Sequence, residues 1–203
     1  MSKPYDPKDA YYRKARQAGL RARSAFKIEE IARRFRLYRP GMAILDLGAA
    51  PGGWLQILAR LVGPKGMVVG VDLQPIAHVA PHVRTLVGDI TSEETLETLR
   101  SIREGRYDAI TSDMAPKTTG IKDVDEARSV ELVRRALDVC ERLLAPGGSF
   151  VAKVFEGAEF SSLLEDIRAR FGQVKLVRPE ATRGRSFEIY VVATGFRGGD
   201  AAD

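Results

Sequence analysis

The sequence predicts an α/β fold in which helices cover both faces of a mostly parallel β-sheet. Segments with the apolar pattern of buried strands alternate with segments that have helical periodicity. The first strand leads through a glycine-rich turn directly into a helix, which is typical of α/β proteins. The last two strands are joined by a polar loop that is too short for a crossover helix, so one strand near the end should run antiparallel.

Short apolar runs that end in aspartate, glycine or a polar turn mark the expected strands. The run from Met67 to Val71 is typical, because it reads Met-Val-Val-Gly-Val and is followed by Asp72. Such β-branched and aromatic residues favour strands. Seven strands are expected, at residues 44–47, 67–71, 83–87, 107–112, 150–155, 174–177 and 187–193.

Helical periodicity fills most of the spaces between these strands. Ser92 is expected to cap one helix, because a serine hydroxyl can accept a hydrogen bond from a backbone N–H of the first turn. Pro146 and the two glycines after it are expected to end the longest helix. The helices are expected at residues 55–61, 92–99, 124–144 and 160–171.

The chain divides into three parts by composition. Residues 1–39 are expected to form a basic helical segment, residues 40–197 the α/β domain, and residues 198–203 a disordered tail. A length of 203 residues and a hydrophobic content of 44% suit one domain with an ordinary core.

The positive charge is concentrated in the first segment. Residues 1–39 hold 12 Lys/Arg and 4 Asp/Glu, a net charge of +8, so residues 40–203 carry −3 of the total of +5. Aromatic residues are interleaved with these cations, among them Tyr5, and this mixture suits a phosphate backbone and unstacked bases. A solvated helix face is the alternative. The RNA contacts are expected from Arg21, Arg23, Arg33 and Arg34.

Several classes of protein are disfavoured. No run approaches the roughly 18 apolar residues of a membrane span, and the N-terminus lacks the apolar core of a signal peptide. The single cysteine, Cys140, stands in an apolar helical pattern and is expected to be buried. The two histidines have no ligand-like partners, so we expect no metal and a cytoplasmic protein.

The turn after the first strand is expected to bind an adenosine-containing cofactor. Asp46 lies near the end of the strand, and Gly48, Gly52 and Gly53 would let the backbone approach a ligand. Asp72, about 20 residues further along, is placed to bond a pair of ribose hydroxyls. A plain turn without a ligand is the alternative.

The composition of the turn argues against a dinucleotide. Ala50 stands where a dinucleotide site has its middle glycine, and Pro51 has no N–H to offer a pyrophosphate. S-adenosylmethionine has no phosphate and carries a positive sulfonium, which suits nearby carboxylates. We therefore favour S-adenosylmethionine over a nicotinamide cofactor.

Aspartates recur at the ends of the four parallel strands that come first in the sequence. Ligands of such sheets bind at the carboxyl ends of the strands. Each aspartate alone could be a helix cap or a turn residue, but four in series favour a site. They are Asp46, Asp72, Asp89 and Asp113.

Two charged residues interrupt strands that otherwise look buried. Lys153 stands within Phe-Val-Ala-Lys-Val-Phe, and Glu188 within Phe-Glu-Ile-Tyr-Val-Val. Because a lysine is rarely buried without a partner, it needs a carboxylate. A structural Lys153–Glu188 ion pair is one interpretation, and a reactive lysine in the ligand crevice is the other.

Four stretches together resemble the FtsJ-type ribosomal RNA 2′-O-methyltransferases. They are DLGAAPGGW, SDMAP, the Lys-Val-Phe of the strand at 150–155, and SFEIYVV. The N-terminal Arg-Ser-Ala-Phe-Lys that ends at Lys27 matches the family's first lysine motif, and the resemblance extends from about Tyr11 to Phe196. It implies a Rossmann-like methyltransferase fold with a seven-stranded sheet, S-adenosylmethionine as cofactor and large-subunit ribosomal RNA, at a uridine, as substrate.

The resemblance also implies roles for single residues. It implies a catalytic set of Lys27, Asp113, Lys153 and Glu188. It further implies cofactor contacts at Gly52, Trp54, Asp72, Asp89 and Asp113. Relatives in the family also act on transfer RNA and on mRNA caps, so the substrate follows less directly than the reaction.

The chemistry agrees with this set. A ribose 2′-hydroxyl is a poor nucleophile until its proton is removed or shared. Lys153 could accept that proton, or it could stay charged and stabilise the developing alkoxide. Three other functions are compatible with an α/β fold of this kind: methylation of a small molecule, RNA binding without catalysis, and nicotinamide-dependent oxidation. The basic first segment argues against a small-molecule substrate. The intact set of lysines and carboxylates argues against RNA binding without catalysis, and the Ala50-Pro51 turn argues against a nicotinamide cofactor.

Overall fold

The computed structural model describes residues 10–182 and 187–198. Some residues with an expected role lie outside the described ranges. They are Tyr5, Arg183 and Arg185 of the loop before the last strand, and residues 199–203 of the expected tail.

The sheet has seven strands in the order β3-β2-β1-β4-β5-β7-β6. All neighbouring pairs are parallel except those of β7, which runs antiparallel to both β5 and β6. This confirms the expected mostly parallel sheet with one antiparallel strand. The strands are β1 (Ala43–Leu47), β2 (Met67–Asp72), β3 (Val83–Val87), β4 (Tyr107–Ser112), β5 (Leu144–Phe155), β6 (Phe171–Val177) and β7 (Glu188–Phe196).

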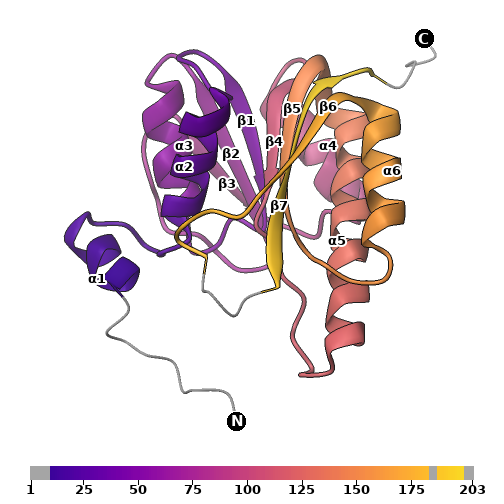
Figure 1. The fold of residues 1–203 in the computed structure, drawn as a ribbon. Coiled ribbons are helices and arrows are strands. Elements are labelled where there is room, and N and C mark those ends of the chain that lie inside the picture. The colour runs from indigo at the N-terminus through magenta and orange to yellow at the C-terminus, as the bar shows by residue number, and fades with distance from the viewer. Residues whose placement is uncertain (1–9, 183–186, 199–203) are drawn as a thin grey trace.

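Helices cover both faces of this sheet (Figure 1). One face carries α2 and α3, and the other carries α4, α5 and α6. A short helix, α1, lies at the lower end of the molecule in the view of Figure 1. The helices are α1 (Ala10–Gln17), α2 (Ala25–Phe35), α3 (Gly53–Val62), α4 (Glu93–Ile102), α5 (Lys122–Leu143) and α6 (Phe160–Arg170).

Each face of the sheet is sealed by an apolar layer. On one side, side chains of α2 and α3 pack on Ile44, Ala109 and Val151 of the central strands. On the other side, side chains of α4, α5 and α6 pack on Leu45 and Ile110. Alternate residues of a strand point to opposite faces. Once the face of one strand residue is known, the residues two and four positions away lie on that same face.

Two local expectations were inexact. Ser92 is the residue before α4, but its hydroxyl makes no capping hydrogen bond. Glu93 and Glu94 fill the first turn instead, where their charge interacts favourably with the helix dipole. As expected, α5 ends just before the Pro146 turn, at Leu143. The turn itself is part of β5. The pairing of β5 with β4 is irregular there, between Tyr107 and Ala109.

No helix among residues 10–182 and 187–198 is long and apolar enough to cross a membrane. Cys140 is buried, as expected.

Candidate active site

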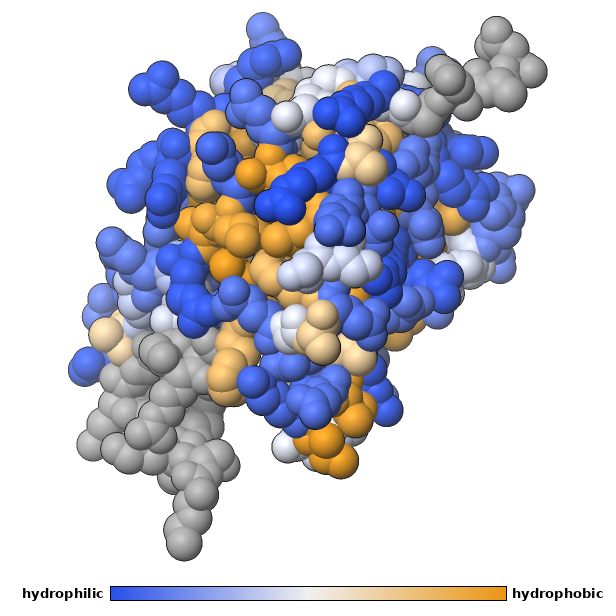
Figure 2. Space-filling model, turned by 45° about the vertical axis from the view of Figure 1, so that its right-hand side comes forward, coloured by the Kyte–Doolittle hydropathy of each residue, from blue (hydrophilic) through white to orange (hydrophobic). Residues whose placement is uncertain are grey.

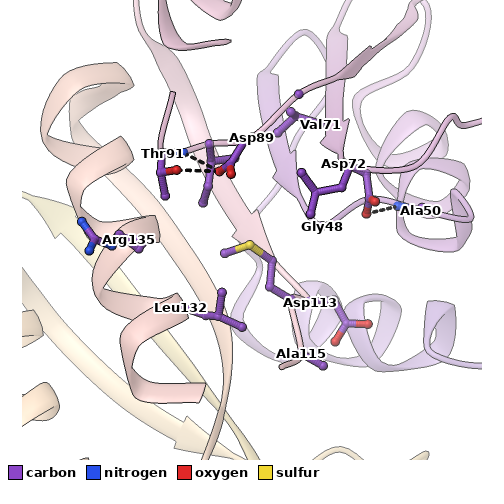
Figure 3. Close-up of a pocket in the computed structure, with 14 residues that line it drawn as sticks. Gly48, Ala50, Val71, Asp72, Asp89, Thr91, Asp113, Ala115, Leu132 and Arg135 are labelled. Carbon is purple, nitrogen blue, oxygen red and sulfur yellow. Dashed lines mark hydrogen bonds between the residues drawn. The ribbon is translucent and has the colours of Figure 1, made fainter. Parts of the chain in front are cut away.

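A cavity of about 480 Å³ opens at the carboxyl ends of β1, β2, β3 and β4. Figure 3 shows Asp72 and Asp89 on one side of it, Leu132 and Arg135 of α5 on the other, and Asp113 at its edge. The strand-end position of this cavity follows from the parallel sheet. Its wall is mainly aliphatic, and its polar side chains include the three aspartates.

The loop backbone holds two of these carboxylates. Asp72 accepts hydrogen bonds from the backbone N–H of Ala50 (3.0 Å) and of Gln74 (2.8 Å). Asp89 accepts from the N–H of Thr91 (2.9 Å) and from its hydroxyl (2.8 Å). The Thr91 donors hold the pKa of Asp89 below its ordinary value. Both carboxylates are therefore fixed in orientation.

The three glycines of the turn have different surroundings. Gly48 lines the cavity, has φ of +71°, and would place a Cβ only 2.5 Å from the Met114 side chain. A Cβ on Gly52 would meet Arg21, and one on Gly53 would meet Ala22. Gly52 and Gly53 thus give room to the N-terminal segment, and the structure does not place them in the cavity wall.

Trp54 also lies outside the cavity wall and is buried between two other elements. Its indole N–H donates to the backbone carbonyl of Ser24 (3.0 Å), just before α2. Its ring lies 6.0 Å from the ring of Tyr190 on β7. Trp54 therefore fixes the first turn of α2 over the sheet, and Lys27 is on that turn.

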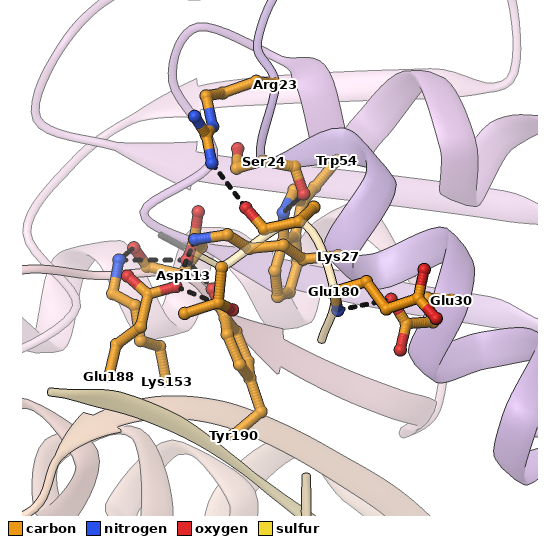
Figure 4. Close-up of polar contacts among 12 residues, drawn as sticks. Arg23, Ser24, Lys27, Glu30, Trp54, Asp113, Lys153, Glu180, Glu188 and Tyr190 are labelled. Carbon is orange, nitrogen blue, oxygen red and sulfur yellow. Dashed lines mark hydrogen bonds and ion pairs between the residues drawn. The ribbon is translucent and has the colours of Figure 1, made fainter. Parts of the chain in front are cut away.

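The four residues of the expected catalytic set converge beside the cavity (Figure 4). Lys153 of β5 donates to the Asp113 carboxylate (2.9 Å) and to the Asp113 backbone carbonyl (2.7 Å). Lys27 of α2 forms an ion pair with Glu188 of β7. The Lys27 and Lys153 side chains are 10% and 9% exposed, so each ammonium has both a carboxylate partner and a narrow opening to solvent.

The structural Lys153–Glu188 ion pair considered from the sequence is wrong. In the β5–β7 register Lys153 stands opposite Tyr190, whereas Glu188 stands opposite Phe155, two residues nearer the strand end. Glu188 is there covered by Lys27, and Asp113 at the end of β4 takes Lys153. The strand register therefore explains why Lys153 pairs with Asp113 and Glu188 pairs with Lys27.

Tyr190 is a member of this cluster that the sequence reasoning did not single out. Its hydroxyl donates to the Asp113 carboxylate (2.9 Å), and Lys27 lies 5.7 Å from its ring centre. Burial and the carboxylates of Asp113 and Glu188 raise the pKa of Tyr190 well above its ordinary value. The phenol thus stays a proton donor to Asp113. The sequence does contain a signal for Tyr190, because it stands two residues from Glu188 and therefore shares its face of the strand.

Asp46 is buried within the sheet and does not line the cavity. The hydroxyl of Thr111 donates to its Oδ1 (2.7 Å), and its Oδ2 has no hydrogen-bond partner among the described residues. Burial raises the pKa of Asp46 to about 8, with Asp113 and Asp72 adding to the rise and Thr111 opposing it. Asp46 is therefore a protonated structural residue near neutral pH, beside rather than in the cavity.

This raised pKa predicts a pH-dependent stability. An acid whose pKa is near 3.8 when unfolded and about 8 when folded contributes stability below pH 4, and this contribution is lost as the pH rises toward 8. The slope from one such group is at most about 1.4 kcal/mol per pH unit. Asp46→Asn removes this titrating group and with it the pH dependence that the group causes. From pH 6 to pH 8 the variant should gain on the order of 2 kcal/mol relative to the wild type in urea unfolding. Identical pH profiles would contradict a raised pKa at Asp46.

The four arginines expected to contact RNA fall into two pairs. Arg21 donates to the carbonyls of Ala77 (2.8 Å) and His78 (2.5 Å), and Arg23 donates to that of Ala181 (2.5 Å). These two guanidinium groups tie the N-terminal segment to neighbouring loops. Arg33 and Arg34 lie in the last turn of α2 and are exposed. Arg33 and Arg34 are therefore more accessible to the phosphates of an RNA than Arg21 and Arg23 are.

Comparison with known proteins decides the family. The model of the FtsJ-like methyltransferases matches residues 20–196, which include the cavity and the whole lysine cluster. The chain belongs to the FtsJ-like methyltransferase family. It is 59% identical to the ribosomal RNA large subunit methyltransferase E of Anaeromyxobacter dehalogenans over 203 residues, which cover 100% of this chain and 76% of the relative.

Two further proteins resemble this FtsJ-like methyltransferase. The ribosomal RNA large subunit methyltransferase E of Myxococcus xanthus is 52% identical over 204 residues, with 100% of this chain and 96% of the relative covered. The crystal structure of a ribosomal RNA methyltransferase from Plasmodium falciparum superposes with a TM-score of 0.79 at 26% identity and covers 88% of this chain and 100% of that chain. The expected resemblance and the expected Rossmann-like methyltransferase fold are thereby confirmed.

Proposed function

We propose that this methyltransferase moves a methyl group from S-adenosylmethionine to a ribose 2′-hydroxyl, that of a uridine, in large-subunit ribosomal RNA. One observation carries the proposal. Two lysines, each with its own carboxylate, meet at the edge of a strand-end cavity. An acceptor hydroxyl needs such a proton-accepting, charge-stabilising cluster, and the relatives named above are ribosomal RNA methyltransferases.

The cavity residues fit S-adenosylmethionine. Asp72 offers fixed carboxylate oxygens for a pair of ribose hydroxyls, and Asp89 offers an acceptor for an N–H. Val71, Leu73 and Ile90 give an aliphatic wall suited to a flat base. Three carboxylates in the lining, those of Asp72, Asp89 and Asp113, suit a cationic ligand better than a pyrophosphate. When bound, S-adenosylmethionine supplies a methyl group already activated by a positive sulfonium.

Lys153 is proposed to accept the proton of the 2′-hydroxyl once its ammonium has released one proton to solvent through the narrow opening of the site. A neutral lysine has two N–H bonds and one lone pair, and the two contacts to Asp113 use both N–H bonds. The lone pair is then left for the substrate hydroxyl. The ion pair of Lys27 with Glu188 places a second cation next to the same point, where it would stabilise the negative charge that develops on the oxygen.

The proposed cofactor role of Asp72 predicts a loss of affinity. Asp72→Ala should weaken binding of S-adenosylhomocysteine by on the order of 1–3 kcal/mol, because the ribose hydroxyls lose their acceptors. Calorimetry measures the affinity, and thermal unfolding checks that the loss of the bonds to Ala50 and Gln74 has not unfolded the turn. An unchanged affinity would remove Asp72 from the site. NAD should not bind to the wild type.

The exposed pair on α2 is proposed to contact the RNA backbone. Arg33 and Arg34 lie six and seven residues beyond Lys27, which is about 10 Å along the helix axis. Their joint replacement by alanine should lower the slope of log affinity against log salt by roughly 1 to 2 units. The matched control removes Arg100 and Arg168, which are exposed on α4 and α6 over the other face of the sheet. Parallel slopes for all three proteins would show that α2 presents only a solvated face.

The choice of RNA is tested with labelled S-adenosylmethionine. Large-subunit RNA, transfer RNA and intact large subunits are offered separately to the purified enzyme. Incorporation is expected in large-subunit RNA, free or assembled, and not in transfer RNA. Label in transfer RNA alone would replace the proposed substrate while leaving the reaction intact. We also propose a cytoplasmic location. Because one chain carries all four residues of the lysine cluster, we propose that the enzyme acts as a monomer.

A further inference from the structure

A second hollow lies at the end of β5, the strand that carries Lys153. It has a volume of about 280 Å³ and is mostly apolar. It lies between the loop that leads into α5, the first turn of α5, and the ends of β5 and β7. Its lining residues are Thr118, Gly120, Lys122, Asp125, Glu126, Phe155 and Phe187.

We propose that this hollow takes the base of the nucleotide that is methylated, with the base stacked on Phe187. The proposal rests on the proposed function and adds the place of the acceptor nucleotide to it. Its first support is position. Phe155 is the register partner of Glu188 and stands two residues beyond Lys153, so it shares their face of the sheet, and Phe187 directly precedes Glu188 in the chain. A ribose held at the lysine cluster therefore carries its base next to this hollow.

The second support is the chain segment that the two sites share. Asp113 and Ala115 line the cofactor cavity, and Thr118 and Gly120 line the hollow. Asp125 accepts from the N–H and hydroxyl of Thr119 and from the N–H of Gly120, so the start of α5 holds the far end of this segment. One short segment thus borders the sites for the methyl donor and for the acceptor.

The third support is an aromatic ring that the fold leaves in solvent. Phe187 is 57% exposed, while the N–H of Glu156 donates to its backbone carbonyl (3.2 Å) and fixes the backbone. The Lys122 ammonium lies over its ring, 4.8 Å from the ring centre. The Lys122 side chain is itself 59% exposed, and its ammonium lies 3.4 Å from the buried carboxylate of Glu126. A separate patch of hydrophobic surface appears at the lower tip of the molecule in Figure 2, at the level where α5 begins and below the start of β7 in Figure 1.

The fourth support is a buried acceptor in the same hollow. Glu126 is 7% exposed, and its Oε1 has no hydrogen-bond partner among the described residues, although Lys122 lies 3.4 Å away. Its carboxylate packs against Gly157, where a Cβ would be 2.2 Å from Oε2. An ionised carboxylate can only accept, so it suits a base edge that carries an N–H, such as that of uracil.

Three variants at one position test the stacking. Phe187→Trp keeps a flat aromatic face, Phe187→Leu keeps the apolar bulk without it, and Phe187→Ala removes both. Stacking is lost in the last two, so their KM for large-subunit RNA should rise about 5- to 150-fold, whereas the Trp variant should stay near the wild type. Affinity for S-adenosylhomocysteine should be unchanged in all three. Val124→Ala removes an exposed side chain of α5 that does not line the hollow, and it should behave as wild type.

The outcomes separate this inference from the proposed function. If the wild type methylates the RNA but the Leu variant keeps a wild-type KM, the stacked base is wrong and the function stands. If Val124→Ala raises KM as much as Phe187→Ala, the effect belongs to the whole surface and the hollow is not a base site. If the wild type does not methylate RNA at a ribose, the proposed function fails and this inference fails with it.

Discussion

Replacing Lys153 by alanine or by arginine should abolish methyl transfer and leave cofactor affinity nearly intact. General-base catalysis contributes about 10²- to 10⁴-fold to a rate, and the alanine variant should lose at least that much in kcat. Arginine keeps a positive charge but cannot give up its proton, so it should fail as well. The measurement is single-turnover methyl transfer to large-subunit RNA, with calorimetry of S-adenosylhomocysteine beside it.

The arginine variant separates the two roles open to Lys153. A base is lost in both variants, whereas an electrostatic stabiliser is lost only in the alanine variant. Near-normal turnover with arginine would show that Lys153 stabilises the developing alkoxide and that the proton leaves by another path. Lys27→Arg is the matched comparison, because Lys27 is assigned only a charge, and this variant should keep more activity than Lys153→Arg.

Asp113→Ala should abolish turnover and also destabilise the fold. Asp113 is the carboxylate partner of Lys153 and the acceptor of the Tyr190 hydroxyl. Removing one partner of a buried ion pair costs about 3–5 kcal/mol, because the other charge is left buried. The backbone carbonyl of Asp113 still accepts from Lys153, so we expect the lower end, about 3 kcal/mol, in urea unfolding.

A second substitution shows whether the buried charge causes the loss. Asp113→Ala combined with Lys153→Met should recover most of the stability, because no ammonium is left without a carboxylate. Asp113→Asn keeps an oxygen for both donors and should cost less stability while remaining inactive. A loss below about 1 kcal/mol in Asp113→Ala, with no recovery in the double variant, would show that the Lys153–Asp113 contact is energetically unimportant.

The mostly parallel sheet and the grouping of three strand-end aspartates could be predicted from sequence for one reason. The carboxyl ends of parallel strands meet at one edge, so Asp72, Asp89 and Asp113 could be expected near each other without coordinates. A lysine inside an apolar strand, such as Lys153, needs a carboxylate partner. Lys27 was different, because only the resemblance to a family brought a residue of the first helix to the same point.

The partners of these residues could not be read from sequence. Which carboxylate takes Lys153 depends on the β5–β7 register, and that register is set by contacts far apart in the chain. Asp46 looked like a strand-end ligand, yet β1 continues through Leu47 and buries its carboxyl group beneath the turn. Trp54 and Gly53 belong to the cofactor motif in sequence, but in space they pack against the N-terminal segment.

The chemical position of the methyl group tests the central claim most directly. RNA labelled by the wild-type enzyme is hydrolysed completely with alkali, and the products are separated. Alkali cleaves RNA through its 2′-oxygen, so a nucleotide methylated there stays joined to its neighbour. We predict that the label appears in one alkali-stable dinucleotide that contains 2′-O-methyluridine, and that Lys153→Ala gives none. Label recovered in a mononucleotide with a methylated base would contradict the account.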